Sequence, residues 1–177
     1  MLQKKFIIIA AISAFFPGVI CAQIPEPSST DKAFLESGIV DSNYKFIDIE
    51  GAKLAFRELS NNFAGTLPIQ INSETSIISV VMTPNYLIFG YKFLIDLDIP
   101  QKIEMKNYLH SKEHRDVVCA NVFTSRYMIA NNNVIALDYY DISNKRIAMI
   151  KITPDICNLK ISNNKNEYVP KMSIQLR

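Results

Sequence analysis

The alternation of apolar and polar positions first predicts a helix over residues 50–63. Five apolar side chains recur there at the i, i+3, i+4, i+7, i+11 spacing of a single helical stripe: Ala52, Ala55, Phe56, Leu59 and Phe63. Asn61, Asn62 and Gly65 are typical helix-ending residues, and Pro68 prevents continuation. The segment is therefore expected to pack its apolar stripe on a core.

Four runs rich in β-branched and aromatic residues predict four strands in two hairpins. The first pair covers residues 75–82 and 86–95, joined by the short turn Thr83-Pro84-Asn85. The second covers 134–141 and 146–153, joined by residues 142–145. Gly90 lies inside the second strand and indicates a bulge or a close backbone approach.

Helical segments are expected between the hairpins. Pro100 suits the start of a helix with Asp98 as its cap, so helical structure is predicted from about residue 101 to 119. A further piece over 122–130 ends at the asparagine run 131–133. This order predicts an α+β fold, with an antiparallel sheet built from two hairpins and two or three helices packed on one face.

The N-terminal residues 1–22 have the pattern of a cleaved signal peptide. Lys4 and Lys5 precede an apolar run over 6–16, and the cleavage site follows Ala22. The run is shorter than the ~20 residues that cross a bilayer, and no second run approaches that length. A periplasmic or secreted protein without stable membrane insertion is expected. An uncleaved membrane anchor and lipidation at Cys21 are the alternatives, but the bulky Ile20 before Cys21 argues against lipidation.

The remaining chain is expected to hold one domain. Residues 23–33 are rich in Pro and Ser and predict a flexible leader. Residues 34–157 form the predicted α+β domain, and residues 158–177 form a polar tail in which 168–176 could add an edge strand. About 155 residues suit one core and leave little room for two.

Charge excludes two classes of partner. The chain has 19 Lys and Arg against 17 Asp and Glu, and the signal accounts for the excess through Lys4 and Lys5. A neutral mature chain lacks the basic excess of proteins that bind nucleic acid or anionic membranes. A protein partner in the envelope or the host is expected instead.

Two cysteines, Cys119 and Cys157, remain after removal of the signal. An even count in an exported chain favours a disulfide. Two buried free thiols are the alternative. The C-x-x-C spacing of thiol-redox enzymes is absent from the sequence.

The sharpest catalytic motif is H-x-x-E-H, formed by His110, Glu113 and His114. On one helix the two histidines would share a face and could bind zinc, with Glu113 as the base. No third ligand is evident downstream, and Lys112 and Arg115 are typical of a solvated helix surface. We therefore expect no metal and no cofactor, and no catalytic residue, because G-x-S-x-G and nucleotide-binding motifs are also missing.

The aspartates and aromatics of the hairpins have ordinary explanations. Asp96, Asp98, Asp138 and Asp141 are expected to end strands, cap helices and form turns rather than act in catalysis. Five aromatics form a candidate binding surface: Phe89, Tyr91, Phe93, Tyr139 and Tyr140. Alternation places the first three on one face of the sheet, which could bind a partner or could be core beneath a helix.

The region from Thr75 to Cys157 resembles a set of small exported bacterial proteins of unknown function. The matching pieces cover about half of the mature chain and are Thr75-Ser76-Ile77-Ile78-Ser79-Val80, Tyr91, Cys119, Arg126, Tyr139-Tyr140-Asp141, Ile150 and Cys157. The resemblance implies a paired Cys119 and Cys157 and a place in the envelope or outside the cell. It brings no catalytic residue.

These patterns favour a non-enzymatic exported protein that acts through protein–protein contacts in the bacterial envelope or outside the cell. It would be a component of a secretion or envelope assembly, or a virulence-associated factor. Two alternatives stay open: an inhibitor or immunity protein against an envelope-acting enzyme, and a small metal-dependent hydrolase that uses His110, Glu113 and His114.

Overall fold

The computed structural model describes residues 24–161. The predictions for the signal peptide and for the edge strand in the tail lie outside the described residues. The elements are α2 (Ser29–Glu36), α3 (Ile49–Ala64), β1 (Ile69–Asn72), β2 (Thr75–Met82), β3 (Tyr86–Phe93), α4 (Ile99–Leu109), α5 (Lys112–Val122), α6 (Arg126–Ala130), β4 (Val134–Tyr140) and β5 (Arg146–Ile152).

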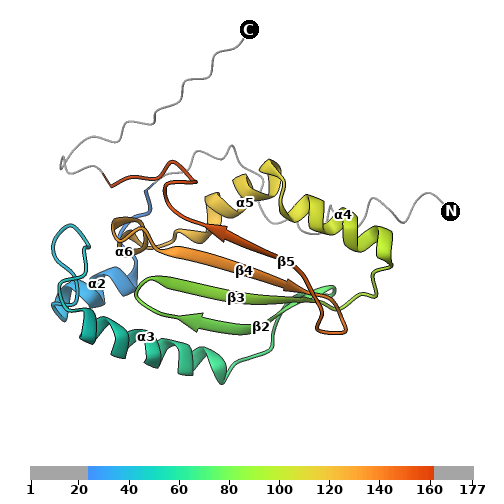
Figure 1. Ribbon diagram of the computed structural model, residues 1–177. Coiled ribbons are helices and arrows are strands. Elements are labelled where there is room, and N and C mark those ends of the chain that lie inside the picture. The colour runs from blue at the N-terminus through green and yellow to red at the C-terminus, as the bar shows by residue number, and fades with distance from the viewer. Residues whose placement is uncertain (1–23, 162–177) are drawn as a thin grey trace, which may run out of the picture.

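The α+β class is confirmed: five strands form one mostly antiparallel sheet with helices packed against it (Figure 1). The strand order is β1-β2-β3-β4-β5, and both predicted hairpins are present as β2–β3 and β4–β5. The hairpins meet through a parallel pair, β3 with β4. This pair was not foreseen, and it arises because the chain returns through α4, α5 and α6 before it starts β4, as a parallel connection requires.

The helix predicted over 50–63 is confirmed as α3. Asp48 caps it by accepting a hydrogen bond from the Gly51 amide at 2.9 Å. Ala52 and Phe56 of the predicted stripe are fully buried. The cap of α4 is confirmed too, because Asp98 and Gln101 form a reciprocal capping box.

The long helical region predicted over 101–119 is divided in two. Helix α4 ends at Leu109, and Ser111 then caps α5 by accepting from the His114 amide at 3.1 Å. The piece predicted over 122–130 is also shorter, because Phe123 leaves the helical conformation and α6 starts only at Arg126.

The prediction of a flexible leader over 23–33 is wrong for its second half, where α2 begins. Ser28 and Asp31 form a capping box at its start. The Asp31 carboxylate is fully buried and also accepts hydrogen bonds from the amides of Arg126 and Tyr127, both at 2.9 Å. One side chain therefore caps α2 and α6 together and fixes this N-terminal segment to the core.

The sequence predicted a bulge or a close backbone approach at Gly90; the bulge lies opposite it on β2, and the close approach comes from a side chain. The β2–β3 register shifts between Ile77 and Ser79, and Ser79 lies opposite Gly90. A Cβ atom at Gly90 would clash with the Ser79 Oγ atom. The Ser79 side chain thus occupies the space that a Cβ atom at position 90 would take, which favours glycine there.

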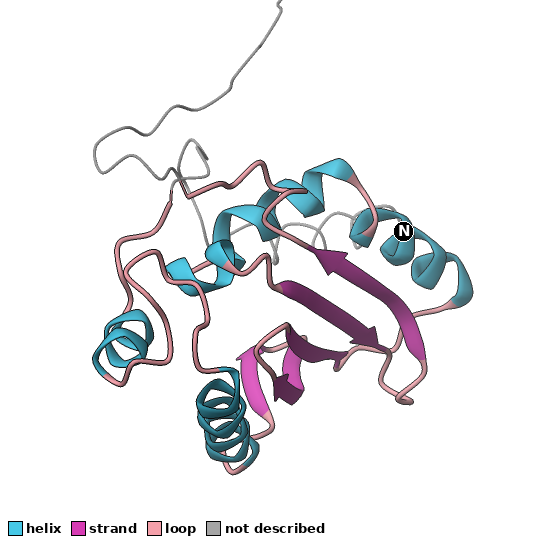
Figure 2. Cartoon of the chain, turned by 60° about the vertical axis from the view of Figure 1, so that its left-hand side comes forward, coloured by secondary structure: helices cyan, strands magenta, loops and turns pink. Residues whose placement is uncertain are grey.

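One face of the sheet is covered by helices, as Figure 2 shows from the side. Residues aligned across the strands on this face are largely buried; they include Val80, Leu87, Phe93, Ile135, Leu137, Tyr139, Ala148, Ile150 and Ile152. Beside them, Phe34, Phe46, Phe56 and Tyr127 pack ring against ring, with centroids 5.2–6.4 Å apart. This core joins α2, α3 and α6.

Candidate functional site

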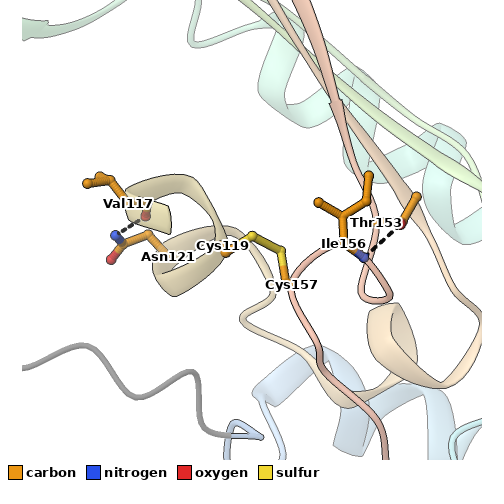
Figure 3. The surroundings of a disulfide bond; sticks show 6 residues. All are labelled: Val117, Cys119, Asn121, Thr153, Ile156 and Cys157. Carbon is orange, nitrogen blue, oxygen red and sulfur yellow. Dashed lines mark hydrogen bonds between the residues drawn. A yellow bond between two sulfur atoms is a disulfide. The ribbon is translucent and has the colours of Figure 1, made fainter. Parts of the chain in front are cut away.

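The disulfide between Cys119 and Cys157 is confirmed (Figure 3). It joins α5 to the segment that follows β5 and spans 38 residues of sequence. The Cys157 amide donates to the carbonyl oxygens of Thr153 and Pro154, which fold the chain into a turn beside the bridge. The bridge thus ties the end of the sheet to the helical layer.

The H-x-x-E-H residues do not lie on one helix. His110 follows the end of α4 and is exposed, Glu113 is exposed in the first turn of α5, and His114 is buried. The turn at His110 and Ser111 removes the shared helical face on which the zinc hypothesis depends. Within residues 24–161, no group of three or more His, Cys, Asp or Glu side chains is placed to hold a metal ion.

His114 belongs to a buried polar cluster. Its Nε2 atom shares a hydrogen bond of 3.1 Å with the Tyr139 hydroxyl, and its ring also packs against Tyr108. Its Nδ1 atom is buried and makes no hydrogen bond within the described part of the chain. Burial, and then the nearby His110, lower the pKa of His114 to about 4. The imidazole is therefore neutral near pH 7 and enclosed by the core.

The aspartates act in caps and turns, as the sequence indicated for Asp98 and Asp141. Asp98 caps α4. Asp141, in the β4–β5 turn, accepts from the amides of Ser143 and Lys145 and from the Lys102 Nζ atom at 2.7 Å. The bond from Lys102 is the main reason that the pKa of Asp141 lies below its usual range. Asp96 is exposed just beyond β3.

The five aromatics do not form a common surface, which corrects that prediction. Phe89, Tyr91 and Phe93 do share a face, but it is the face that the helices cover. Phe93 and Tyr139 are buried and stack on each other, with centroids 6.0 Å apart. Tyr140 points to the opposite face. Alternation identified which residues share a face, but the sequence holds no signal for which face the helices would choose.

The opposite face of the sheet carries no helix of the described residues, and we call it the open face (Figure 2). Its members follow from the strand registers: Ser76, Ser79 and Val81 of β2, Tyr86, Ile88, Gly90 and Lys92 of β3, Ala136, Asp138 and Tyr140 of β4, and Arg146, Met149 and Lys151 of β5. Val81, Tyr86 and Met149 are exposed to 48%, 44% and 37%. The open face thus offers apolar side chains to solvent.

A buried carboxylate organises one end of the open face. Both oxygens of Asp138 accept from the Arg146 guanidinium, at 2.7 Å each, and Oδ2 also accepts from the Tyr140 hydroxyl at 2.7 Å. The guanidinium also lies 5.9 Å from the centre of the Tyr140 ring. These bonds raise the pKa of Arg146 and fix the guanidinium at the surface.

No protein-family model and no curated protein matches the chain. Among solved structures, it is similar to a candidate secreted protein from Pseudomonas aeruginosa, with a TM-score of 0.48 and 13% identity over 63% of this chain and 96% of that chain. It is also similar to EpsS, the pilotin of the Vibrio vulnificus type 2 secretion system, with a TM-score of 0.36 and 10% identity over 62% and 94%. Likenesses at these identities and TM-scores place the chain in no family.

None of the helices within residues 24–161 combines the length and the apolar character needed to cross a membrane.

Proposed function

We propose that the protein is exported and acts without catalysis, through protein–protein contacts in the bacterial envelope or outside the cell. Its role is that of a component of a secretion or envelope assembly, or of a virulence-associated factor. The open face is the observation that carries this proposal.

The disulfide supports the proposed compartment. Bridges such as Cys119–Cys157 persist in oxidising surroundings, which include the periplasm and the outside of the cell. The signal peptide expected over residues 1–22 would deliver the chain there. Alkylation of free thiols, followed by mass measurement of the protein from its natural source, tests this point. A mature chain that begins after Ala22 and takes up label only after reduction is expected.

The open face supports a function that depends on contact with another protein. A solvent-facing antiparallel sheet commonly carries polar side chains, so exposed Val81, Tyr86 and Met149 depart from that pattern. Tyrosine, methionine and arginine are also the side chains that protein interfaces favour. A partner laid on the open face would remove these apolar surfaces from water without any change in the core.

Co-purification from the producing cell tests the proposal with a matched pair of variants. Val81→Asp introduces a charge on the open face, and Leu54→Asp introduces the same charge on the exposed side of α3, where Leu54 is 55% exposed. We expect the partner to be lost with Val81→Asp and retained with Leu54→Asp. Retention by both variants would contradict the proposal. A single enzyme as partner would favour the inhibitor alternative, and several proteins would favour an assembly.

A further inference from the structure

We infer that the partner docks on the open face through an acidic segment that also carries aliphatic side chains. This inference rests on the proposed function and names the chemistry of the partner.

The charged side chains of the open face are mostly positive. Lys92, Arg146 and Lys151 lie on it, and Asp138 is its only acidic residue among the described strands. The mature chain as a whole is balanced, with 17 acidic residues against the 17 basic residues that remain after Lys4 and Lys5. Positive charge is therefore concentrated on the face that the helices leave uncovered.

Asp138 cannot neutralise the two lysines, because its carboxylate is already engaged. Arg146 holds both oxygens, and the Tyr140 hydroxyl donates to one of them. Neither Lys92 nor Lys151 takes part in an ion pair within residues 24–161. Both ammonium groups are therefore open to pairing with a carboxylate of a partner.

Lys92 has the least ordinary position of the three. It lies on β3, with β2 on one side and β4 on the other, and is half-buried. A cation in such a place has lost part of its hydration before any partner arrives, so a carboxylate that reaches it has less water to displace. Position 92 thus favours an acidic side chain over a neutral one.

The register gives the spacing of the acidic groups. Lys92, Tyr140 and Arg146 lie opposite one another on β3, β4 and β5. Neighbouring strands are about 4.8 Å apart, so the backbone positions of Lys92 and Arg146 are roughly 10 Å apart, with Tyr140 between them. Two carboxylates about this far apart on the partner would meet both. Arg146 keeps donors for such a contact because its side chain is 55% exposed despite the pair with Asp138.

The apolar side chains of the open face favour a partner segment that also carries apolar side chains. Met149 lies on the open-face row next to that of Lys92 and Arg146, and Val81 lies one row further on, beside the half-buried Ile88 and in line with Lys151. A purely acidic ligand would leave these side chains in water. Aliphatic side chains on the partner would cover them, and burial of apolar area supplies affinity that charge alone does not.

Photo-crosslinking in the producing cell tests the inference. A benzophenone amino acid at position 81 is used with three backgrounds: the natural chain, the double variant Lys92→Glu/Lys151→Glu, and the control Lys32→Glu/Lys45→Glu. The control makes the same change in net charge at exposed lysines off the sheet. The crosslinked peptide is then sequenced by mass spectrometry.

We expect the crosslinked peptide to be rich in Asp, Glu and aliphatic residues. The yield should fall by about tenfold or more in the open-face variant, because two attractions become repulsions, and should be unchanged in the control. A Glu→Lys change in the partner peptide should restore part of the yield with Lys92→Glu. Thermal melting of both variants shows that each is folded, and Lys151→Glu alone serves if the double variant is not.

Different results of this experiment would overturn the proposed function and the acidic-segment inference. A crosslinked partner whose peptide lacks acidic residues, or whose yield survives the charge reversal, overturns the acidic-segment inference and leaves the proposed function standing. The absence of any protein crosslink from position 81 overturns the proposed function, and the inference with it.

Discussion

Replacement of Cys119 and Cys157 by alanine should cost the folded protein much of its stability. The bridge closes a loop of 38 residues. In the chain-entropy description such a loop restricts the unfolded chain by about 4 kcal/mol at 25 °C. Domains of this size are stable by only ~5–15 kcal/mol, so the loss is a substantial fraction of the total.

Urea unfolding measures this loss. With a urea dependence of roughly 2 kcal/mol per molar, a loss of about 4 kcal/mol lowers the midpoint by about 2 M. Reduction of the natural protein should produce a similar shift and should leave the double alanine variant unchanged. A variant whose midpoint falls by less than ~0.5 M would refute the reasoning, because the bridge would then contribute little to the unfolded chain's restriction.

Three further predictions concern buried groups. Burial lowers the pKa of His114 from 6.5 to about 4, so between these pH values the unfolded chain binds a proton that the folded chain does not. The free energy of unfolding should therefore fall by about 3 kcal/mol from pH 6.5 to pH 4. Urea midpoints of the natural protein and of His114→Gln measure this loss, and equal pH slopes for the two would contradict it. Asp31→Ala leaves buried amides at the starts of α2 and α6 without an acceptor and should destabilise the protein by about 3 kcal/mol or more. The control Asp116→Ala removes an exposed carboxylate and should change stability by less than about 0.5 kcal/mol. Similar losses in the two variants would disprove the role of Asp31 as a cap for both helices. Gly90→Ala should lower the free energy of unfolding by about 1 kcal/mol, because the added Cβ atom meets the Ser79 Oγ atom. Adding Ser79→Ala should recover most of that loss. If thermal melts show that the losses of the two single variants simply add in the double variant, the clash is ruled out.

The sequence predicted the elements whose signal is local. The strands β2 to β5 stand out as continuous β-branched and aromatic runs bounded by turn residues, and α3 shows a full apolar stripe. Helix α2 was missed because its stripe is short and its start lies in a Pro- and Ser-rich stretch. What holds α2 is the contact of Asp31 with Arg126 and Tyr127, almost a hundred residues away. A cap that serves two helices leaves no local signal.

The candidate site depends on information that a single sequence lacks. The spacing of Phe89, Tyr91 and Phe93 showed that they share a face, but the choice of face depends on where α4 and α5 return across the sheet. For the same reason the importance of Lys92 became visible only once the parallel β3–β4 pair placed it opposite Tyr140. The Ser111 cap between His110 and His114 was a local signal, and it could have shown that the H-x-x-E-H residues belong to two helices.

The distribution of partner crosslinks over the molecular surface shows whether the open face is the binding surface. A photo-reactive side chain is placed in turn at the open-face positions Val81, Tyr86 and Met149 and at the comparably exposed helical positions Leu54 and Ile103. We expect a partner protein to be crosslinked from the open-face positions and not from α3 or α4. Crosslinks to that partner from Leu54 or Ile103, with none from the open face, would contradict it.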